Sequence, residues 1–313
     1  MLRAQEKLIV FSAVVMIIGS ASLAEPALAD SGRRFLESRL VKTLGSKDPA
    51  LIERAARRLG LAGMADALDH PSRRRQVTVA VLKAVALVDR AWVLLPRIAK
   101  LMAHPGADRA MASMAAAAAI EVTEGMRQPD LEQTGETPSL ERETGEMLLR
   151  VARSREVSLD VRVRAVMALA HLVDVAWWPE QAPLLALLSD GDPSIREAAV
   201  ELYAASAPPP ALQRLARLVV GDPSDRVARA AAVCVCARVE RRGSQRELSV
   251  LRKARAYPRI RRLVESLDAG DDQLVDLARC LARSRAREDR RALAQLRRRS
   301  RHLRRLLRRG VFR

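Results

Sequence analysis

The residues that decide the fold are Asp-Pro-Ser-Ile-Arg-Glu-Ala-Ala, at positions 192–199. Asp192 can cap a helix, because its carboxylate accepts hydrogen bonds from the free amides of a first turn. Pro193 suits the first helical position, where its missing N–H costs nothing, and proline disfavours helical geometry in the residue before it. One dipeptide therefore ends one helix and begins the next. The Ile and Ala residues that follow have helical spacing and predict one apolar face.

Related junctions recur along the chain, each joining an apolar segment to a new helical pattern. They lie at Asp48 and Pro49, Pro71, Pro105, Ser158, Asp192 and Pro193, Asp222 and Pro223, and Pro258. The steps between junctions are similar in length. They are 34 residues from Pro71 to Pro105, 34 from Leu159 to Pro193, 30 from Pro193 to Pro223 and 35 from Pro223 to Pro258. A period in this range is typical of an array of helical hairpins, in which stacking buries faces that one hairpin cannot bury alone.

The composition agrees with an all-helical chain. Aromatic residues make up 3% of the 313 residues, whereas all hydrophobic residues make up 49%. The apolar content is therefore mostly Ala, Leu and Val. Ala and Leu favour helices, while strands would require more aromatic residues and threonine.

The stretch at 192–199 resembles the Asp-Pro-x-Val-Arg-x-x-Ala-Ala core of HEAT repeats, including the short bacterial HEAT-like type of the phycobilin lyases. The segment from Ser158 to Val166 is similar, whereas the copy at Asp222 departs by one position. The resemblance covers roughly residues 35–280. It implies a right-handed α-solenoid of about six to seven hairpins. It also implies that Arg162 and Arg196 pack along the stack beside the capping aspartates.

The first 29 residues have the order of a secretory signal. Arg3 and Lys7 precede a run of apolar and small residues from Leu8 to Ala24, and Ala27-Leu28-Ala29 has the small-x-small form that signal peptidase cuts. We expect cleavage after Ala29 and a periplasmic or secreted mature protein. The alternative is an uncleaved signal anchor, because the apolar run is borderline in length for crossing a bilayer.

The remaining chain divides by composition. HEAT-like repeats are expected at 30–122 and again at 139–282. The acidic segment at 123–138 interrupts the period and is interpreted as a loop or insert, either disordered or functional. A helix is expected to restart at Thr137. An Arg-rich amphipathic helix is expected at 283–313.

This Arg-rich tail holds fourteen Arg against Glu288 and Asp289, a net charge of +12. Its leucines fall on one side at helical spacing, so it can cap the stack with an apolar face and leave Arg in water. Alternatively, it lies on an anionic membrane surface or grips an acidic envelope polymer. The arginines expected to contact a polyanion are Arg297, Arg298, Arg301, Arg304, Arg305 and Arg308. Export and the shortage of aromatic residues disfavour a nucleic acid partner.

Three cysteines follow the signal: Cys234, Cys236 and Cys280. Cys234 and Cys236 are two apart on an expected helix and point to different sides, so they cannot easily bridge each other. Cys280 could pair with one of them only if packing brought its helix alongside. The favoured interpretation is three small buried core residues.

The sequence contains no nucleophile–base pair, no glycine-rich phosphate loop and no metal-site spacing of Cys and His. We therefore expect no catalytic, cofactor-binding or metal-binding residues, and no cofactor. A curved repeat array offers an extended concave surface. The sequence favours a non-catalytic scaffold that binds another protein through that surface, with a HEAT-like lyase or other enzyme as the remaining alternative.

Overall fold

The computed structural model describes residues 42–43, 49–71, 75–103, 108–125, 137–175, 181–206, 211–242, 245–266, 273–284 and 286–299. Helices and turns account for these residues, and no strand occurs among them. The all-helical prediction is confirmed. The expected signal at 1–29 and residues 126–136 of the acidic segment lie outside the described residues.

The chain forms two compact units that divide between Asp89 and Arg90. The first unit contains α3 (Pro49–Asp69), α4 (Arg75–Ala84) and the 3₁₀ turn η1 (Val85–Leu87). Gly60 interrupts α3 with φ 66° and ψ 171°, a conformation that glycine adopts without steric cost. The Thr78 hydroxyl of α4 donates a buried hydrogen bond of 2.8 Å to the Ala67 carbonyl, which joins α4 to α3.

The second unit contains the repeat array. Its elements are η2 (Ala91–Leu94), α5 (Leu95–Ala103), α6 (Arg109–Gly125), α8 (Thr137–Arg153), α9 (Leu159–Val175), α10 (Gln181–Leu187), α11 (Pro193–Ser206), α12 (Ala211–Gly221), α13 (Asp225–Arg242), α14 (Gln245–Lys253), α15 (Tyr257–Glu265), α16 (Gln273–Arg283) and α17 (Arg287–Arg299).

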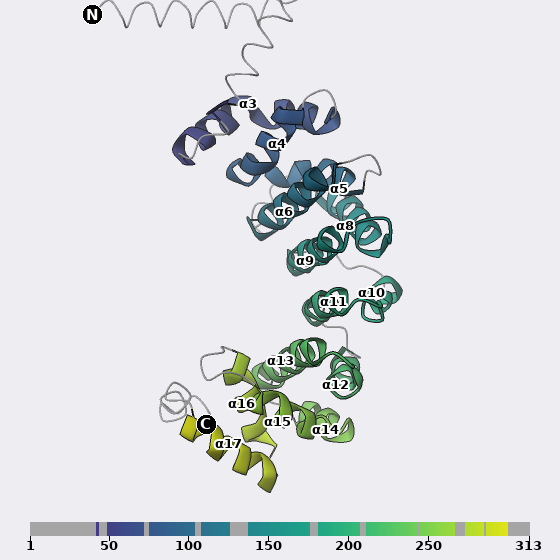
Figure 1. Ribbon diagram of the computed structural model, residues 1–313, viewed down its shortest axis with the longest axis vertical. Coiled ribbons are helices and arrows are strands. Elements are labelled where there is room, and N and C mark those ends of the chain that lie inside the picture. Colours follow the sequence, from purple (N-terminus) through teal and green to yellow (C-terminus); the bar gives the residue numbers. More distant parts are fainter. Residues whose placement is uncertain are drawn as a thin grey trace, which may run out of the picture. The chain divides into compact units, whose positions relative to one another are not determined.

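These helices stack in two rows (Figure 1). The inner row consists of α6, α9, α11, α13 and α16, each packed on the next, and it lies on the inside of the curve that this unit describes. The outer row consists of α5, α8, α10, α12 and α14. Hairpins pair α5 with α6, α8 with α9, α10 with α11, and α12 with α13. The final repeat has three helices, α14 to α16, and α17 packs on α15 and α16.

Alanine lines the contacts within the inner row. Ala115 and Ala119 on α6, Ala165 on α9, and Ala228 and Ala232 on α13 have no exposed side-chain surface. Such small side chains let neighbouring helices approach closely. Larger residues from the outer row, among them Leu148, Leu187 and Leu215, fill the space between the two rows.

Two junctions have matching capping aspartates. The Asp192 carboxylate accepts a hydrogen bond of 2.8 Å from the Ser194 amide, and α11 begins at Pro193. The Asp222 carboxylate accepts the equivalent bond from the Ser224 amide, also at 2.8 Å. However, α13 begins at Asp225, so Pro223 precedes the helix and does not occupy its first position. Helix α13 therefore begins two residues after its proline, whereas α11 begins at its proline.

The other junctions differ more. Helix α3 begins at Pro49 and α9 begins at Leu159, directly after Ser158. Pro71 lies in a turn and α4 begins at Arg75, so the interpretation of Pro71 as a first helical residue is wrong. Asp48 and Pro105 lie outside the described residues.

Two helix boundaries use signals that the repeat pattern did not contain. Helix α6 begins at Arg109, and the Asp108 carboxylate accepts a hydrogen bond of 3.1 Å from the Ala110 amide. Before Pro258, α14 ends through Arg255, whose left-handed φ of 55° brings the Ala256 amide to the Leu251 carbonyl at 3.0 Å. Pro258 lies in the first turn of α15, which begins at Tyr257.

Arginines connect each repeat to the next. Arg162 on α9 donates to the Ala152 carbonyl at 2.9 Å and to Asp190, in the turn before α11, at 2.5 Å. Arg196 on α11 makes a bidentate pair with Asp222, in the turn before α13, at 2.9 and 3.0 Å. This hydrogen bonding raises the pKa of Arg196 above its usual range. Each arginine therefore fixes the start of the following inner helix.

We predict that Arg196→Ala lowers the free energy of unfolding by about 3 kcal/mol, because it leaves the buried Asp222 carboxylate without its partner. Urea denaturation of the full chain measures the change. Arg226→Ala is the matched control, because Arg226 is 68% exposed where it pairs with Glu197. The control should cost less than about 1 kcal/mol. Equal losses in the two variants would contradict the connecting role of Arg196.

Candidate interaction surface

The side of the inner row that faces away from the outer row forms a continuous surface, here called the inner face. On α9, for example, Ala165 and Leu169 are buried, whereas Met167 on the opposite side is 38% exposed. The charged and sulfur-containing residues of the inner face include Met114, Glu121 and Glu124 on α6, Asp160, Arg164, Met167 and His171 on α9, Glu197 and Glu201 on α11, Arg226, Arg229, Cys234 and Arg238 on α13, and Asp276, Arg279 and Arg283 on α16.

The half of the inner face on α6, α9 and α11 is mainly acidic. Ser113 on α6 donates a hydrogen bond of 2.8 Å to Asp160 on α9. His171 on α9 lies 3.3 Å from the Glu124 carboxylate on α6. These contacts link neighbouring inner helices at their exposed edges, and they leave carboxylates as the prevailing charge there.

Glu201 on α11 is the group of this acidic half whose protonation is most perturbed. Loss of water around the carboxylate raises its pKa, and the negative charge of Glu197 one turn earlier raises it further. His171 acts in the opposite direction. The local environment therefore disfavours the ionised form of Glu201.

The half on α13 and α16 is basic. Its arginine patch consists of Arg226, Arg229 and Arg238 on α13, and Arg279 and Arg283 on α16. Arg226 pairs with Glu197 at 2.5 Å, where the two halves meet. Between the arginines of α13 lies a half-buried strip of small side chains, from Ala230, Val233 and Ala237.

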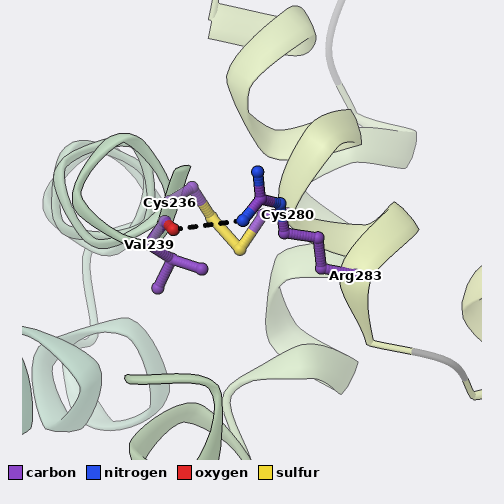
Figure 2. Close-up of a disulfide and its surroundings, with 4 residues drawn as sticks. All are labelled: Cys236, Val239, Cys280 and Arg283. Carbon is purple, nitrogen blue, oxygen red and sulfur yellow. Dashed lines mark hydrogen bonds between the residues drawn. A yellow bond between two sulfur atoms is a disulfide. The ribbon is translucent and has the colours of Figure 1, made fainter. Parts of the chain in front are cut away.

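A disulfide between Cys236 and Cys280 joins the two helices of the arginine patch (Figure 2). Their Cα atoms are 5.2 Å apart, and both side chains are 2% exposed. Arg283 donates to the Val239 carbonyl at 3.4 Å beside the bridge. The interpretation of Cys236 and Cys280 as unbridged core residues is therefore wrong. Cys234 is half-buried on α13 and takes no part in this disulfide.

Helix α17 shows how the described part of the Arg-rich tail is held. Leu293 and Leu296 are 4% and 5% exposed, in the contact with α15 and α16. Asp289 is fully buried and accepts hydrogen bonds from the Ser284 hydroxyl and, at 3.1 Å, from Arg261 Nε. Residues 287–299 therefore pack on the stack through their apolar face.

The structure separates the two groups of residues that the sequence singled out. The junction residues Arg162, Asp192, Arg196 and Asp222 lie at the joints between repeats, away from the inner face. Of the expected polyanion contacts, Arg297 and Arg298 lie on α17, and Arg298 is exposed. Arg301, Arg304, Arg305 and Arg308 lie outside the described residues.

The arginine patch itself escaped prediction from the sequence. Its arginines are spread over residues 226–283, and only the packing of α16 against α13 brings them together. Asp190 and Asp289 also escaped prediction, although each lies 28 residues after the arginine it binds, and the Arg196–Asp222 separation is 26. An aspartate 26 or 28 residues after a repeat arginine is therefore a sequence pattern from which these pairs could have been predicted.

Within the described part of the chain, no group of three or more His, Cys, Asp or Glu side chains is placed to hold a metal ion. No helix there is long and apolar enough to cross a membrane.

No family model and no curated protein sequence matches the chain. Among solved structures, an engineered protein from the Northeast Structural Genomics Consortium is 18% identical with a TM-score of 0.46, over 83% of this chain and 71% of that one. A second engineered protein from the consortium is 18% identical with a TM-score of 0.42, over 85% and 97%. A designed armadillo repeat protein in complex with the peptide (KR)4 is 16% identical with a TM-score of 0.40, over 82% and 98%.

We predict that loss of the disulfide destabilises the chain by about 4 kcal/mol, the chain-entropy value for a closed loop of this length. The bridged residues are 44 apart. Urea unfolding should show that a reductant lowers the stability of the native chain nearly to that of the Cys236→Ala/Cys280→Ala variant. Cys234→Ala is the control and should respond to reductant as the native chain does. A native chain indifferent to reductant would contradict a stabilising bridge.

We predict that Glu201→Gln raises the urea midpoint at pH 7.5. A raised carboxyl pKa in the folded state means that ionisation costs stability, and this cost is present above the raised pKa. The cost disappears as the pH falls below the ordinary carboxyl range, so the difference between variant and native chain should vanish near pH 3.5. Glu121→Gln controls for the change in net charge. A Gln variant that is less stable at pH 7.5 would contradict the prediction.

Proposed function

We propose that this protein is an exported, non-catalytic HEAT-like repeat scaffold that binds another protein through the inner face of its second unit. The observation that carries the proposal is the division of labour among its charged residues. Arg162, Arg196, Asp190 and Asp222 are committed to joining repeats. The inner face carries a second set of charged residues, which lie on the exposed side of the inner row and away from the joints between repeats.

The geometry of the inner face suits an extended partner. Successive inner helices present their exposed sides in line, so a segment crossing the row meets a new set of side chains at each helix (Figure 1). Repeat arrays generally bind through such surfaces, because curvature adds contact area without a closed pocket. One half of the inner face carries mainly carboxylates and the other mainly arginines. A partner of complementary charge would therefore bind in one orientation along the row.

Export is supported by two independent features. The signal-like order of residues 1–29 predicts secretion, with a periplasmic or secreted destination and a signal anchor as the alternative. The Cys236–Cys280 disulfide is the kind of bond that persists in oxidising compartments. A protein made for the reducing cytoplasm would gain little from that bridge.

A second candidate function belongs to the Arg-rich tail, as a ligand for an anionic membrane surface or an acidic envelope polymer. The packing of α17 favours an electrostatic version of this function. Leu293 and Leu296 are occupied in the stack, whereas Arg287, Arg290 and Arg291 are exposed. A membrane contact would then depend on arginine charge and not on insertion of a leucine face.

Site-specific photocrosslinking in the cells that make the protein tests the proposed function. A photoreactive amino acid replaces Met167 at the centre of the inner face, and Val220 on α12 of the outer row serves as the matched control, because both residues are exposed. We expect a discrete protein adduct from position 167, in the exported fraction, and none from position 220. Equal adducts from both positions, or adducts confined to the cytoplasm, would contradict the proposal.

A further inference from the structure

We propose that the arginine patch on α13 and α16 binds an acidic, extended peptide segment of a partner protein. This inference rests on the proposed function and specifies the chemistry of the partner at one half of the inner face. The first observation is the charge of the patch. Five arginines, Arg226, Arg229, Arg238, Arg279 and Arg283, lie on two adjacent helices, and the described carboxylates of these helices are Asp225 and Asp276.

Both of those carboxylates are engaged. Asp225 pairs with Arg259 of α15, and Asp276 lies 3.4 Å from Arg279 on its own helix. On α13, Arg226 pairs with Glu197 of α11. The five arginines outnumber Asp225, Asp276 and Glu197, so the described part of the patch carries a net positive charge. Such an excess attracts an acidic partner and speeds its association.

The second observation is the shape of the α13 surface. Ala230, Val233 and Ala237 form a half-buried strip of small side chains, while Arg229 and Arg238 flank the strip on opposite sides. Small side chains allow a peptide backbone to approach the helix closely. Arginines on both sides can then reach carboxylates that alternate along an extended chain, whose successive side chains point in opposite directions.

The third observation concerns Arg229, whose side chain is half-buried beside this strip. A guanidinium presents a fork of N–H donors that matches a carboxylate. The terminal N–H groups of Arg229 can therefore bind a carboxylate of the peptide.

The same features disfavour a membrane or a nucleic acid at this patch. The inner row lies on the inside of the curve, so its concave surface matches a flat bilayer poorly (Figure 1). The inner face carries no described aromatic side chain on which bases could stack. The carboxylates of the neighbouring acidic half, Glu197 and Glu201 among them, would repel a long polyanion that extended beyond the patch.

The disulfide gives the patch its rigidity. Cys236–Cys280 and the Arg283–Val239 contact fix α16 against α13 in one register, since both pairs are 44 residues apart (Figure 2). Arg229 and Arg279 are therefore held at a constant separation before any ligand arrives. A preorganised set of donors loses less entropy on binding than a mobile one.

Fluorescence anisotropy with the mature full chain and a labelled peptide of alternating Glu and Ala tests this inference. A peptide of about ten residues suffices, because its extended length of about 33 Å exceeds that of α13. We expect Arg229→Gln/Arg279→Gln to weaken binding by about tenfold or more. The control, Arg287→Gln/Arg291→Gln on α17, makes the same change in net charge and should weaken binding by less than about twofold.

A second variant keeps the inference testable if the first variant misfolds. Ala230→Glu keeps every arginine and places a carboxylate in the middle of the small-residue strip, so it should also abolish binding of the acidic peptide. Circular dichroism and the urea midpoint check the fold of each variant.

Equal weakening by the patch and α17 variants would overturn the inference, as would full binding by Ala230→Glu. Stronger binding of anionic vesicles or duplex DNA than of the peptide, through the same arginines, would also overturn it. Photocrosslinking from position 167 reports on the proposed function separately. An adduct there that survives Arg229→Gln/Arg279→Gln, together with an unaffected peptide affinity, would discard the acidic-peptide inference and leave the scaffold function in place.

Discussion

The pairing of an arginine in one repeat with an aspartate in the turn of the next is the interaction on which the second unit depends. Hydrophobic stacking alone would let alanine-rich helices slide, because alanine side chains interlock only weakly. The Arg162–Asp190 and Arg196–Asp222 pairs remove that freedom. Each joins a helix to the turn that precedes the following inner helix, so the register of α11 and of α13 is set by the repeat before it. A buried pair of this kind is more valuable for specifying register than for net stability.

The end of the array uses the same chemistry in a modified form. Arg261 occupies the position in α15 that Arg196 occupies in α11, relative to Pro258 and Pro193, and it binds Asp289 of α17. Here the partner lies on the terminal helix and not in a turn between hairpins. The final repeat also has three helices, and the disulfide fastens its inner helix to α13. Within the described residues, a covalent bond and a buried Ser284–Asp289–Arg261 network hold this repeat to α13 and to α17.

The joints between repeats do not use the residues of the inner face, through which we propose that the protein binds its partner. A residue that holds a repeat in place cannot be replaced without loss of stability, whereas a residue on the exposed side of an inner helix can change with little cost to the fold. The dipolar pattern of the inner face, with carboxylates on α6 to α11 and arginines on α13 and α16, is therefore the part of the molecule where partner specificity can reside. The inner face is concave, so it fits an extended polypeptide segment better than a flat surface such as a bilayer.

Much of this architecture was predictable from local sequence, because local physics determines it. The Asp-Pro junction at 192–193 starts α11, the helix expected at Thr137 begins there, and the low aromatic content agrees with the absence of strands from the described residues. Capping, proline geometry and helical periodicity act within a few residues, so a single chain displays them. Where the local signal was weak, the boundary shifted: Pro71 lies in the turn after α3, and α4 begins only at Arg75. The positive φ of Gly60 divides α3 at a position that the repeat pattern did not mark.

Tertiary packing decided the features that depend on distant residues meeting. No local pattern shows that Cys236 lies beside Cys280, because this requires α16 to stack on α13 across 44 residues. The arginine patch has the same origin, since its charges come from two helices that are neighbours only in the folded stack. The tail behaved likewise, because its leucine stripe predicted an apolar face but only the surface offered by α15 and α16 determined what that face contacts. A sequence records which side chains need a partner, whereas the fold determines which partner comes within reach.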